Sequence, residues 1–286
     1  MLMKIQNICV LGGGLMGRQI GLHAAIYPYQ VRIFDSNPAV LEDVARWKDQ
    51  YLAGRIAKGR MTPEQVAEIS GRFHICATLE DAVADADLVI EAIIEQKDIK
   101  SALFQQISRL VRPDTIIATN SSRMASSLFA PDVVNPQRLA NLHFFNPALV
   151  MQLVEIVQGA HCSDETAQAL YAFVESIGKT PVLLKKEVEG FVVNRILQAI
   201  KSEARWLVEN GYCSPQDVDI ACEKGLNHPM GPFRLEDLSG IDLTYNIMQR
   251  QMEETGEKPT GYDLIKSLYD KGCYGKKSGH GFYDYE

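Results

Sequence analysis

The first two-thirds of the chain alternates short apolar runs with stretches of helical character. Most of the runs are rich in Val and Ile and are bounded by turn residues, which is typical of buried parallel strands. The helical stretches between them include residues 97–111 and 165–177. This alternation predicts right-handed βαβ units and therefore an α/β fold built on a doubly wound sheet. The predicted strands are residues 5–11, 30–34, 73–76, 87–91, 114–118, 139–142, 150–157 and 180–184.

One connection between predicted strands, residues 38–71, is long for a single crossover. Inside it, Thr62-Pro63-Glu64-Gln65 has the composition of a helix start, with Thr as N-cap, Pro at the first helical position and Gln at the third. The segment therefore predicts two helices, which we expect to form an arm projecting beside the ligand site.

After about Lys186 the strand pattern stops. Residues 191–210 are strongly helical, Ser214 opens another helix by the same capping pattern, and Pro and Gly residues punctuate further helices. We therefore expect two domains. The first is an α/β domain over residues 1–186, with its helical arm near 38–71, and the second is a smaller all-helical domain over residues 187–286.

The composition is that of an ordinary soluble globular protein. Of 286 residues, 46% are hydrophobic and 23% are charged, and the formal net charge is −7. A negative chain is a poor match for nucleic acid or an anionic membrane, so we expect neither as a main partner. The sequence shows no apolar run of membrane-spanning length, no signal peptide and no CxxC pair among its six cysteines. These features favour a cytoplasmic protein with reduced thiols and no metal site.

A glycine-rich loop after the first predicted strand carries the first chemical signal. Its GxGxxG pattern stands between a strand and a helix, which is the context that makes the motif informative. The glycines permit a tight turn, close approach of the backbone to a pyrophosphate, and packing of the helix on the sheet. Free N–H groups at the helix start can bind the pyrophosphate, so the loop predicts a dinucleotide site in a Rossmann-type domain. The expected contacts are Gly12, Gly14, Leu15, Met16 and Gly17.

Asp35 ends the second predicted strand, 18 residues after Gly17. From there its carboxylate can accept hydrogen bonds from the adenosine ribose hydroxyls. The same charge would repel the 2′-phosphate of NADP, so the sequence favours NAD. A glycine-rich turn without a ligand is the alternative interpretation.

His143 is the candidate for proton transfer. It follows a predicted strand on the carboxyl side of the sheet, where doubly wound folds bind ligands. Glu155 lies on the next predicted strand, which can bring its carboxylate beside the imidazole. A histidine acting as a base needs its second nitrogen held and its charge stabilised, and a buried carboxylate does both. The alternative is a solvent-facing Glu155; His23 and His74 lack such a context and are interpreted as structural.

Several segments in a fixed order resemble the L-3-hydroxyacyl-CoA dehydrogenase family, especially its short-chain 3-hydroxybutyryl-CoA branch, over nearly the whole chain. The resemblance implies NAD-dependent interconversion of L-3-hydroxyacyl-CoA and 3-ketoacyl-CoA, a step of fatty acid or butyrate metabolism. It also implies a homodimer formed through the helical domain, which would close over the substrate. The segments are residues 12–17, 91–95 (EAIIE), 120–122 (NSS), 143–147 (HFFNP) with Glu155, 190–195 (GFVVNR), 227–232 (NHPMGP) and 275–283 (GKKSGHGFY).

Carried over residue by residue, the resemblance implies a role for each site residue. His143 and Glu155 form the catalytic pair, Ser122 holds the substrate oxygen and reaches the nicotinamide, and Asn194 lies near the reacting carbonyl. Lys58, in the helical arm, would grip the CoA end. The implied cofactor contacts beyond the glycine loop are Asp35, Glu95, Lys100, Ser122, Asn146 and Lys277.

The sequence departs from the family pattern at four positions. Arg123 stands beside Ser122 in place of a small hydroxyl residue, and it either reshapes the acyl pocket or points to solvent. The other departures are Leu149 for a proline, Gln152 for a lysine, and Glu189 for the proline before Gly190.

The sequence leaves three alternative functions, each with a feature that speaks against it. A dehydrogenase of free hydroxy acids, such as gulonate or carnitine, is disfavoured by Phe144-Phe145 after the histidine. A 6-phosphogluconate-type dehydrogenase would need a catalytic lysine, and residues 190–195 contain none. A non-catalytic dinucleotide-binding protein is disfavoured because the four implied catalytic residues are all present.

Overall fold

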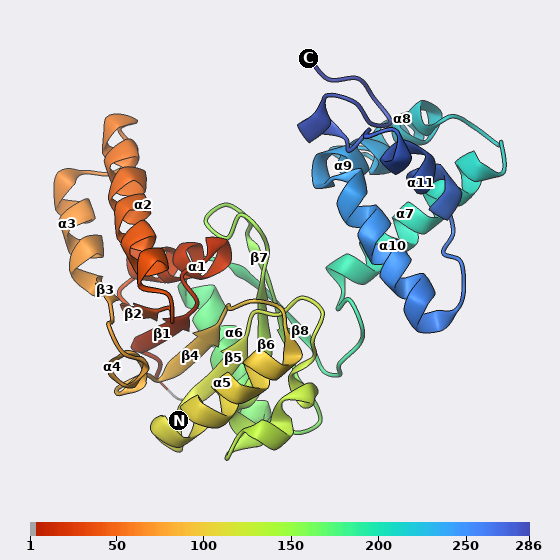
Figure 1. Cartoon of the computed structure of the whole chain (residues 1–286). Helices are drawn as coiled ribbons and strands as arrows, with labels where there is room; N and C mark the ends of the chain where they lie inside the picture. Colours follow the sequence, from red (N-terminus) through yellow and green to blue (C-terminus); the bar gives the residue numbers. More distant parts are fainter. Residues whose placement is uncertain (1–3) are drawn as a thin grey trace. The chain divides into compact units, whose positions relative to one another are not determined.

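The computed structural model describes residues 4–286, which divide into two compact units (Figure 1). The first unit ends at Val192, and every strand of the described residues lies in it. The second unit, Val193–Glu286, is built from helices. The two units are described separately below.

The first unit is organised around one eight-stranded sheet with the order β3-β2-β1-β4-β5-β6-β7-β8. The strand order reverses between β1 and β4, which is the switch point where doubly wound sheets bind ligands. The doubly wound α/β fold expected from the sequence is therefore confirmed. The strands are β1 Asn7–Leu11, β2 Gln30–Phe34, β3 Phe73–Ile75, β4 Leu88–Glu91, β5 Ile116–Thr119, β6 Leu139–Phe144, β7 Leu153–Val157 and β8 Thr180–Leu184.

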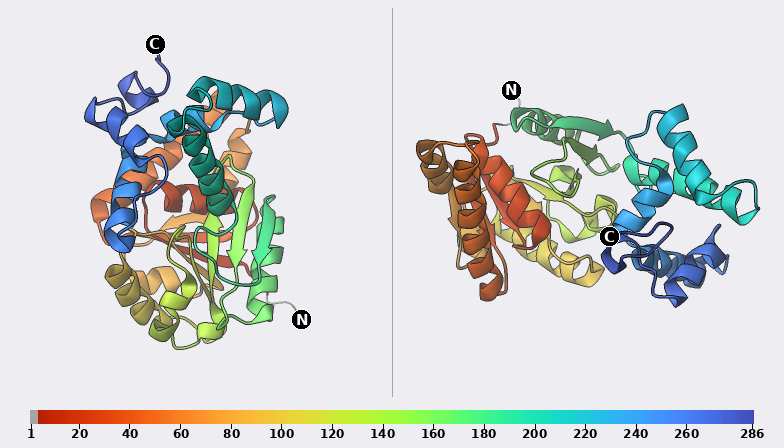
Figure 2. Two further views of the ribbon diagram at one scale, coloured as in Figure 1. Left: turned by 90° about the vertical axis from the view of Figure 1, so that its right-hand side faces the viewer. Right: turned by 90° about the horizontal axis from the view of Figure 1, so that it is seen from above.

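Helices cover both faces of this sheet, as the ribbon views show (Figures 1 and 2). On one face, α1, α2, α3 and α6 bury apolar side chains against alternate strand residues such as Val10 and Ile33. On the other face, α4 and α5 pack on the intervening residues, including Leu11 and Val89. Two apolar layers follow from the alternation of side chains along each strand. The helices are α1 Leu15–Ile26, α2 Pro38–Ala57, α3 Pro63–Arg72, α4 Leu79–Val83, α5 Lys97–Leu110 and α6 Asp164–Ser176.

The sheet departs from an all-parallel arrangement at one place, because β7 runs antiparallel to β6. Only the short stretch between Phe144 and Leu153 joins these strands, and a parallel crossover needs a dozen or more residues. The antiparallel register places His143 directly opposite Glu155. This pairing is the structural basis of the candidate site.

The long connection after β2 contains two helices, as its sequence predicts. Thr62 caps α3 with a complete capping box in which Gln65 bonds back to the N-cap backbone, and Pro63 occupies the first helical position. In Figure 1, α2 and α3 lie side by side and project from the sheet as an arm.

The second unit buries charged side chains as well as apolar ones. Arg205 and Glu236 are each 1% exposed and pair at 3.2 Å, and Lys201 adds a second contact to Glu236 at 3.4 Å. Asp237, also 1% exposed, accepts the backbone N–H groups of Phe282 and Tyr283 and so ties the C-terminal segment to α9. Within residues 4–286, no helix is both long and apolar enough to cross a membrane. The helices of this unit are α7 Val193–Glu209, α8 Pro215–Gly225, α9 Pro232–Ser239, α10 Ile241–Thr255 and α11 Tyr262–Asp270.

His23, on α1, gives the first unit a pH-dependent stability. Its Nε2 donates to the carbonyl of Ile177 at 2.9 Å, and burial together with the charge of Lys179 lowers the pKa of His23 from 6.5 to about 4. As the pH falls, the imidazole of His23 is therefore protonated in the unfolded chain at a higher pH than in the folded protein. The folded protein loses stability as the pH falls from about 6.5 to 4. We expect the loss to approach about 3 kcal/mol from this residue.

Urea unfolding between pH 7 and pH 4 measures this effect. The His23→Gln variant should lose less stability across the range than wild type, whereas His74→Gln, at an exposed position on β3, should follow wild type. An unchanged pH slope in His23→Gln would show that the burial of His23 does not matter for stability.

Candidate active site

The glycine loop between β1 and α1 has the shape that a bound pyrophosphate needs. Gly12 has a φ of +105°, and a Cβ there would lie 2.5 Å from the carbonyl oxygen of Ala92. At Gly17 a Cβ would lie only 1.9 Å from the Gly12 carbonyl oxygen, so this glycine permits helix packing. By contrast, a Cβ at Gly14 would meet no atom within 4 Å, which leaves its backbone open to a ligand. No side chain caps α1 at Gly14, and its first turn holds no acidic residue, so the helix start is suited to an anion.

Asp35 fixes the back of this loop. One carboxylate oxygen accepts the Gly13 N–H at 2.8 Å, and the other accepts the Asn37 N–H at 2.9 Å. The carboxylate therefore lies beside the glycine loop at the end of β2, where the sequence placed it. Its charge remains available to ribose hydroxyls and unfavourable to a phosphate.

His143 and Glu155 meet across β6 and β7. The imidazole Nδ1 donates to Glu155 Oε2 at 2.9 Å, and the two side chains are 6% and 0% exposed. The structure therefore brings the two side chains into contact, and Glu155 is not solvent-facing. With Nδ1 engaged by Glu155, Nε2 is the ring nitrogen left for a ligand, and no hydrogen bond to it is formed within residues 4–286. The rings of Phe145 and Phe191 lie 4.5 Å and 5.6 Å from the imidazole, which limits the access of water.

The loop that carries Ser122 is held by two asparagines for which the sequence implied no role, Asn120 of the 120–122 segment and Asn141. Asn120 Oδ1 accepts the Phe144 N–H at 2.9 Å, which joins this loop to the end of β6. Asn141, fully buried on β6, accepts the Ser126 N–H and donates to the Met124 carbonyl. Ser122 follows β5 and His143 nearly ends β6, so both lie at the carboxyl edge of neighbouring parallel strands. Arg123 is exposed and makes no ion pair with the described residues, which favours its pointing to solvent.

A buried ionic network lies under the same edge of the sheet. Glu91, which ends β4, is 0% exposed and accepts from Lys100 at 2.5 Å and from the Thr119 hydroxyl at 2.6 Å. Lys100 is 1% exposed and also contacts Glu95 at 3.1 Å, and Glu95 in turn accepts the Ser121 hydroxyl. The sequence implied roles for Glu95 and Lys100 but none for Glu91, which was quoted only as part of the 91–95 segment; its signal was an acidic residue at the end of an apolar strand.

The remaining predicted contacts lie in three different places. Asn146 is exposed in the turn after β6, and Lys58 is exposed at the end of α2. Asn194 and Lys277 belong to the second unit, where Lys277 pairs with Asp242 at 2.6 Å, and this hydrogen bond lowers the pKa of the Asp242 carboxyl.

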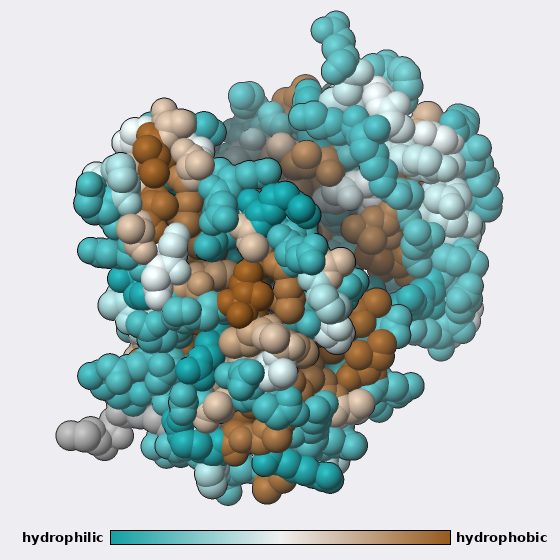
Figure 3. Space-filling view, turned by 60° about the vertical axis from the view of Figure 1, so that its left-hand side comes forward, coloured by the Kyte–Doolittle hydropathy of each residue, from teal (hydrophilic) through white to brown (hydrophobic). Residues whose placement is uncertain are grey.

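Exposed apolar side chains adjoin the glycine loop. Figure 3 shows a face on which apolar side chains interrupt a mostly hydrophilic surface. Leu15, at the start of α1, is 51% exposed, and Ile94, in the loop after β4, is 58% exposed. Large apolar side chains left in solvent beside an open backbone are typical of a ligand site.

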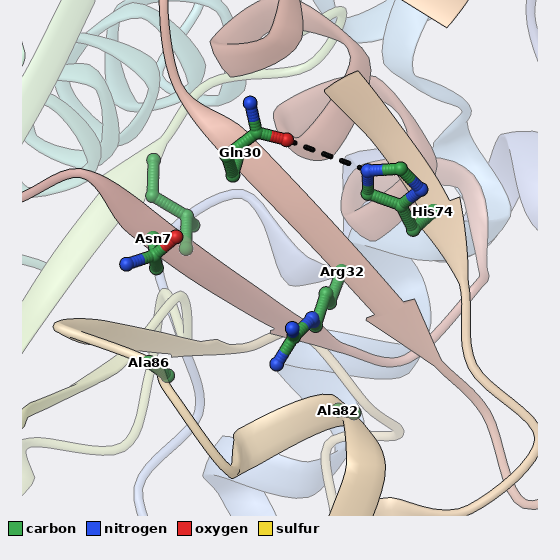
Figure 4. A pocket seen from close by; sticks show the side chains of 7 residues that line it. Asn7, Gln30, Arg32, His74, Ala82 and Ala86 are labelled. Carbon is green, nitrogen blue, oxygen red and sulfur yellow. Dashed lines mark hydrogen bonds between the residues drawn. The ribbon is translucent and has the colours of Figure 1, made fainter. Parts of the chain in front are cut away.

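A small cavity elsewhere in the first unit is a weaker candidate. Its volume is about 80 Å³, and it lies at the amino ends of β1 and β2, away from the carboxyl edge that carries the glycine loop and His143 (Figure 4). Its polar lining is already engaged, because His74 contacts Gln30 at 3.4 Å and Arg32 pairs with Asp85 at 3.2 Å. Residues 4–286 also contain no group of three or more His, Cys, Asp or Glu side chains that could hold a metal ion.

Comparison with known proteins decides the family. Residues 7–188 match the NAD-binding domain of 3-hydroxyacyl-CoA dehydrogenase, and residues 190–285 match the C-terminal domain of the same enzyme. The chain belongs to the 3-hydroxyacyl-CoA dehydrogenase family. The family, the NAD cofactor and the enzyme class expected from the sequence are thereby confirmed.

Individual relatives agree over the full length. A probable 3-hydroxybutyryl-CoA dehydrogenase of Bacillus subtilis is 39% identical over 285 residues, which cover 99% of both chains. The crystal structure of (S)-3-hydroxybutyryl-CoA dehydrogenase from Ralstonia eutropha superposes with a TM-score of 0.89 at 31% identity, covering 99% of this chain and 100% of that one. A diketoreductase, described as acting on dicarbonyl compounds, superposes with a TM-score of 0.88 at 30% identity and covers 98% and 99%.

Proposed function

We propose that this family member interconverts short-chain L-3-hydroxyacyl-CoA and 3-ketoacyl-CoA, 3-hydroxybutyryl-CoA and acetoacetyl-CoA in particular, with His143 as the acid and base. The observation that carries the proposal is the buried 2.9 Å hydrogen bond from His143 Nδ1 to Glu155. It fixes the tautomer and leaves Nε2 to exchange a proton with the substrate oxygen.

Oxidation of the alcohol removes a proton from oxygen and a hydride from carbon. Nicotinamide, when bound, accepts the hydride. His143 Nε2 takes the proton, and the Glu155 carboxylate stabilises the imidazolium that forms. In this proposal Ser122 donates a hydrogen bond that orients the substrate oxygen, and Asn194 is the further polar residue that the family resemblance implies. In the reverse direction the imidazolium returns its proton to the oxygen of the reduced carbonyl. In both directions, holding the reactants in place lowers the entropic part of the activation barrier.

The residues of the glycine loop fit the cofactor. The open backbone at Gly14 and the uncapped start of α1 accept the pyrophosphate, and Asp35 accepts the ribose hydroxyls. Glu95 and Asn146 would contact the nicotinamide end, and Lys277 is the further cofactor contact that the family resemblance implies. Lys100 is buried, so in this proposal it acts mainly by holding Glu95 in place.

Asp35 should make the enzyme prefer NADH to NADPH. We expect kcat/KM for NADH to exceed that for NADPH by about 10²-fold or more, because placing like charges together costs several kcal/mol. Asp35→Asn, which keeps the shape of the side chain but loses its charge, should narrow the gap. Steady-state kinetics with NADH and NADPH measure this ratio of kcat/KM values. An equal kcat/KM for the two cofactors would refute the assignment of Asp35 to the ribose hydroxyls.

The similarity to a diketoreductase supports a second candidate, reduction of a dicarbonyl compound that carries no CoA. Like the dehydrogenase of free hydroxy acids considered above, this candidate acts on a substrate without CoA. The same fold and the same histidine could carry out either reaction. NADH oxidation with acetoacetyl-CoA, longer 3-ketoacyl-CoAs and a CoA-free 1,3-diketone separates them. The proposal predicts the highest kcat/KM with acetoacetyl-CoA; a higher value for the diketone would replace it with the second candidate.

We further propose that the enzyme is a cytoplasmic homodimer assembled through the helical unit. Large apolar side chains stand exposed there, which is the composition of an interface core rather than of a free surface. All six cysteines are free thiols, in keeping with a reducing compartment. Sedimentation velocity measures the oligomeric state in solution, and we expect a species of twice the mass of the 31.9 kDa chain. The exposed side chains are Ile196 (55%), Trp206 (41%), Ile220 (57%), Leu238 (54%) and Leu243 (53%).

A further inference from the structure

The chain segment that follows β8 contacts both members of the His143–Glu155 pair. The Val192 backbone N–H donates to Glu155 Oε1 at 2.9 Å, while Oε2 of the same carboxylate accepts from His143. The ring of Phe191 lies edge-on to the imidazole, with the ring centroids 5.6 Å apart. Two consecutive residues therefore touch the carboxylate and the imidazole, although neither residue can itself transfer a proton.

The backbone of this segment is held in an unusual conformation. The Phe191 N–H donates to the Val188 carbonyl at 3.1 Å and closes a β-turn. Gly190 is the third residue of that turn, with a φ of +74°, which suits glycine. Glu189 is the second residue, where proline is common but most residues fit, so this departure from the family pattern leaves the turn intact. Phe191 itself has a φ of +50°, which is rare for a bulky residue.

Packing around Phe191 maintains this conformation. Its side chain is 2% exposed and lies in an apolar cluster with Val157 of β7 and Leu184 of β8. A strained backbone persists only where its surroundings determine it, and such residues are frequent at functional sites. The strain at Phe191 coincides with its contact to the imidazole.

The start of the segment is also anchored, to the loop that carries Ser122. Glu187 Oε1 accepts the Ser126 hydroxyl at 3.0 Å and the Ser127 N–H at 2.9 Å. Residues 187–192 are therefore tied at one end to the Ser122 loop and at the other to Glu155.

We propose that residues 187–192 are a positioning segment for the His143–Glu155 pair. Val192 fixes the carboxylate through Oε1 so that Oε2 faces His143, and Phe191 restrains the imidazole ring. The inference rests on the proposed acid and base role of that pair. Loosening the segment should therefore slow the chemical step, while NADH affinity, set by the glycine loop, stays unchanged.

Gly190→Ala tests the proposal, because alanine disfavours the φ that closes the turn. The matched control is Gly211→Ala, at a φ of +73° in the second unit with no atom within 4 Å of the new Cβ. We expect Gly190→Ala to lower kcat by roughly tenfold or more, since misplacing a catalytic group by about 1 Å can cost 10²-fold. The Kd for NADH, measured by fluorescence titration, should stay within about twofold, and Gly211→Ala should keep wild-type kcat.

A double-mutant cycle separates positioning from a general structural role. If the segment acts through the carboxylate, Gly190→Ala should have less than about a twofold further effect on kcat once Glu155 is replaced by Gln. Phe191→Leu keeps an apolar side chain in the cluster but removes the ring edge, so it should also lower kcat. If Gly190→Ala does not fold, Phe191→Leu replaces it in the double-mutant cycle with Glu155→Gln.

Two results would overturn the positioning role. One is a kcat within twofold of wild type in Phe191→Leu and in folded Gly190→Ala; the other is a Gly190→Ala effect that multiplies fully with Glu155→Gln. A His143→Asn enzyme with wild-type turnover would instead overturn the proposed function itself, so the two failures are distinguishable.

Discussion

Replacing His143 with asparagine is expected to lower kcat by about 10²–10⁴-fold, the usual contribution of a general acid or base. Asparagine keeps a polar side chain of similar reach but cannot take up a proton near neutral pH. The affinity for NADH should barely change, because the glycine loop and Asp35 are separate from the histidine in sequence and in hydrogen bonding. Steady-state kinetics with acetoacetyl-CoA and a fluorescence titration with NADH give the two values.

Two further variants define this experiment. Glu155→Gln should lower the rate as well, because the imidazolium loses the charge that stabilises it. His74→Asn, at an exposed position on β3, is the matched control and should leave kcat unchanged. If purified His143→Asn turned over near the wild-type rate, the assignment of the acid and base would be wrong.

Free acetoacetate should be a far poorer substrate than acetoacetyl-CoA. The chain is negative overall, yet Lys58 and Arg60 stand exposed together at the end of α2 without an ion pair among the described residues. Binding energy from contacts to a remote phosphate can hold the acyl group in position for reaction. Because the free acid lacks every contact that the CoA portion makes, we expect its kcat/KM to be lower by roughly 10²-fold or more.

The placement of Lys58 has its own test. Lys58→Ala should weaken binding of acetoacetyl-CoA, and the effect should shrink as salt rises, because an exposed contact to phosphate is screened. Arg109→Ala removes one positive charge from the exposed end of α5 and serves as the control. Similar efficiency with acetoacetate, its pantetheine thioester and its CoA ester would contradict the CoA assignment. An unchanged Lys58→Ala would contradict only the position of that lysine.

Local sequence signals predicted most of the fold. The expected strand at residues 30–34 coincides with β2, and the capping sequence at Thr62 begins α3 at Pro63, because both signals depend on nearby residues alone. The glycine loop was equally predictable, since Gly12 and Gly17 occupy backbone positions that leave no room for a Cβ, while Gly14 leaves its backbone open to a ligand. His143 and Glu155 could be proposed as a pair, but the sequence left their register open. The antiparallel pairing of β7 with β6 places the two residues opposite each other.

Other parts of the site depend on contacts between distant residues. Glu91, Thr119 and Lys100 form one buried network although they come from β4, β5 and α5. Asn141 supports the Ser122 loop through hydrogen bonds that reach back 15 to 17 residues. Such groups can be buried because they neutralise each other's charge and complete each other's hydrogen bonds. The local sequence around each residue does not indicate which distant residue is its partner.

The most direct measurement of the central claim is NADH consumption by the purified chain with acetoacetyl-CoA, with the acyl product identified by mass spectrometry and chiral analysis. The account predicts that each NADH oxidised yields one L-3-hydroxybutyryl-CoA in wild type, and that the rate falls at least about 10²-fold in His143→Asn. Absence of NADH consumption with acetoacetyl-CoA in a wild-type protein that binds NADH would contradict it.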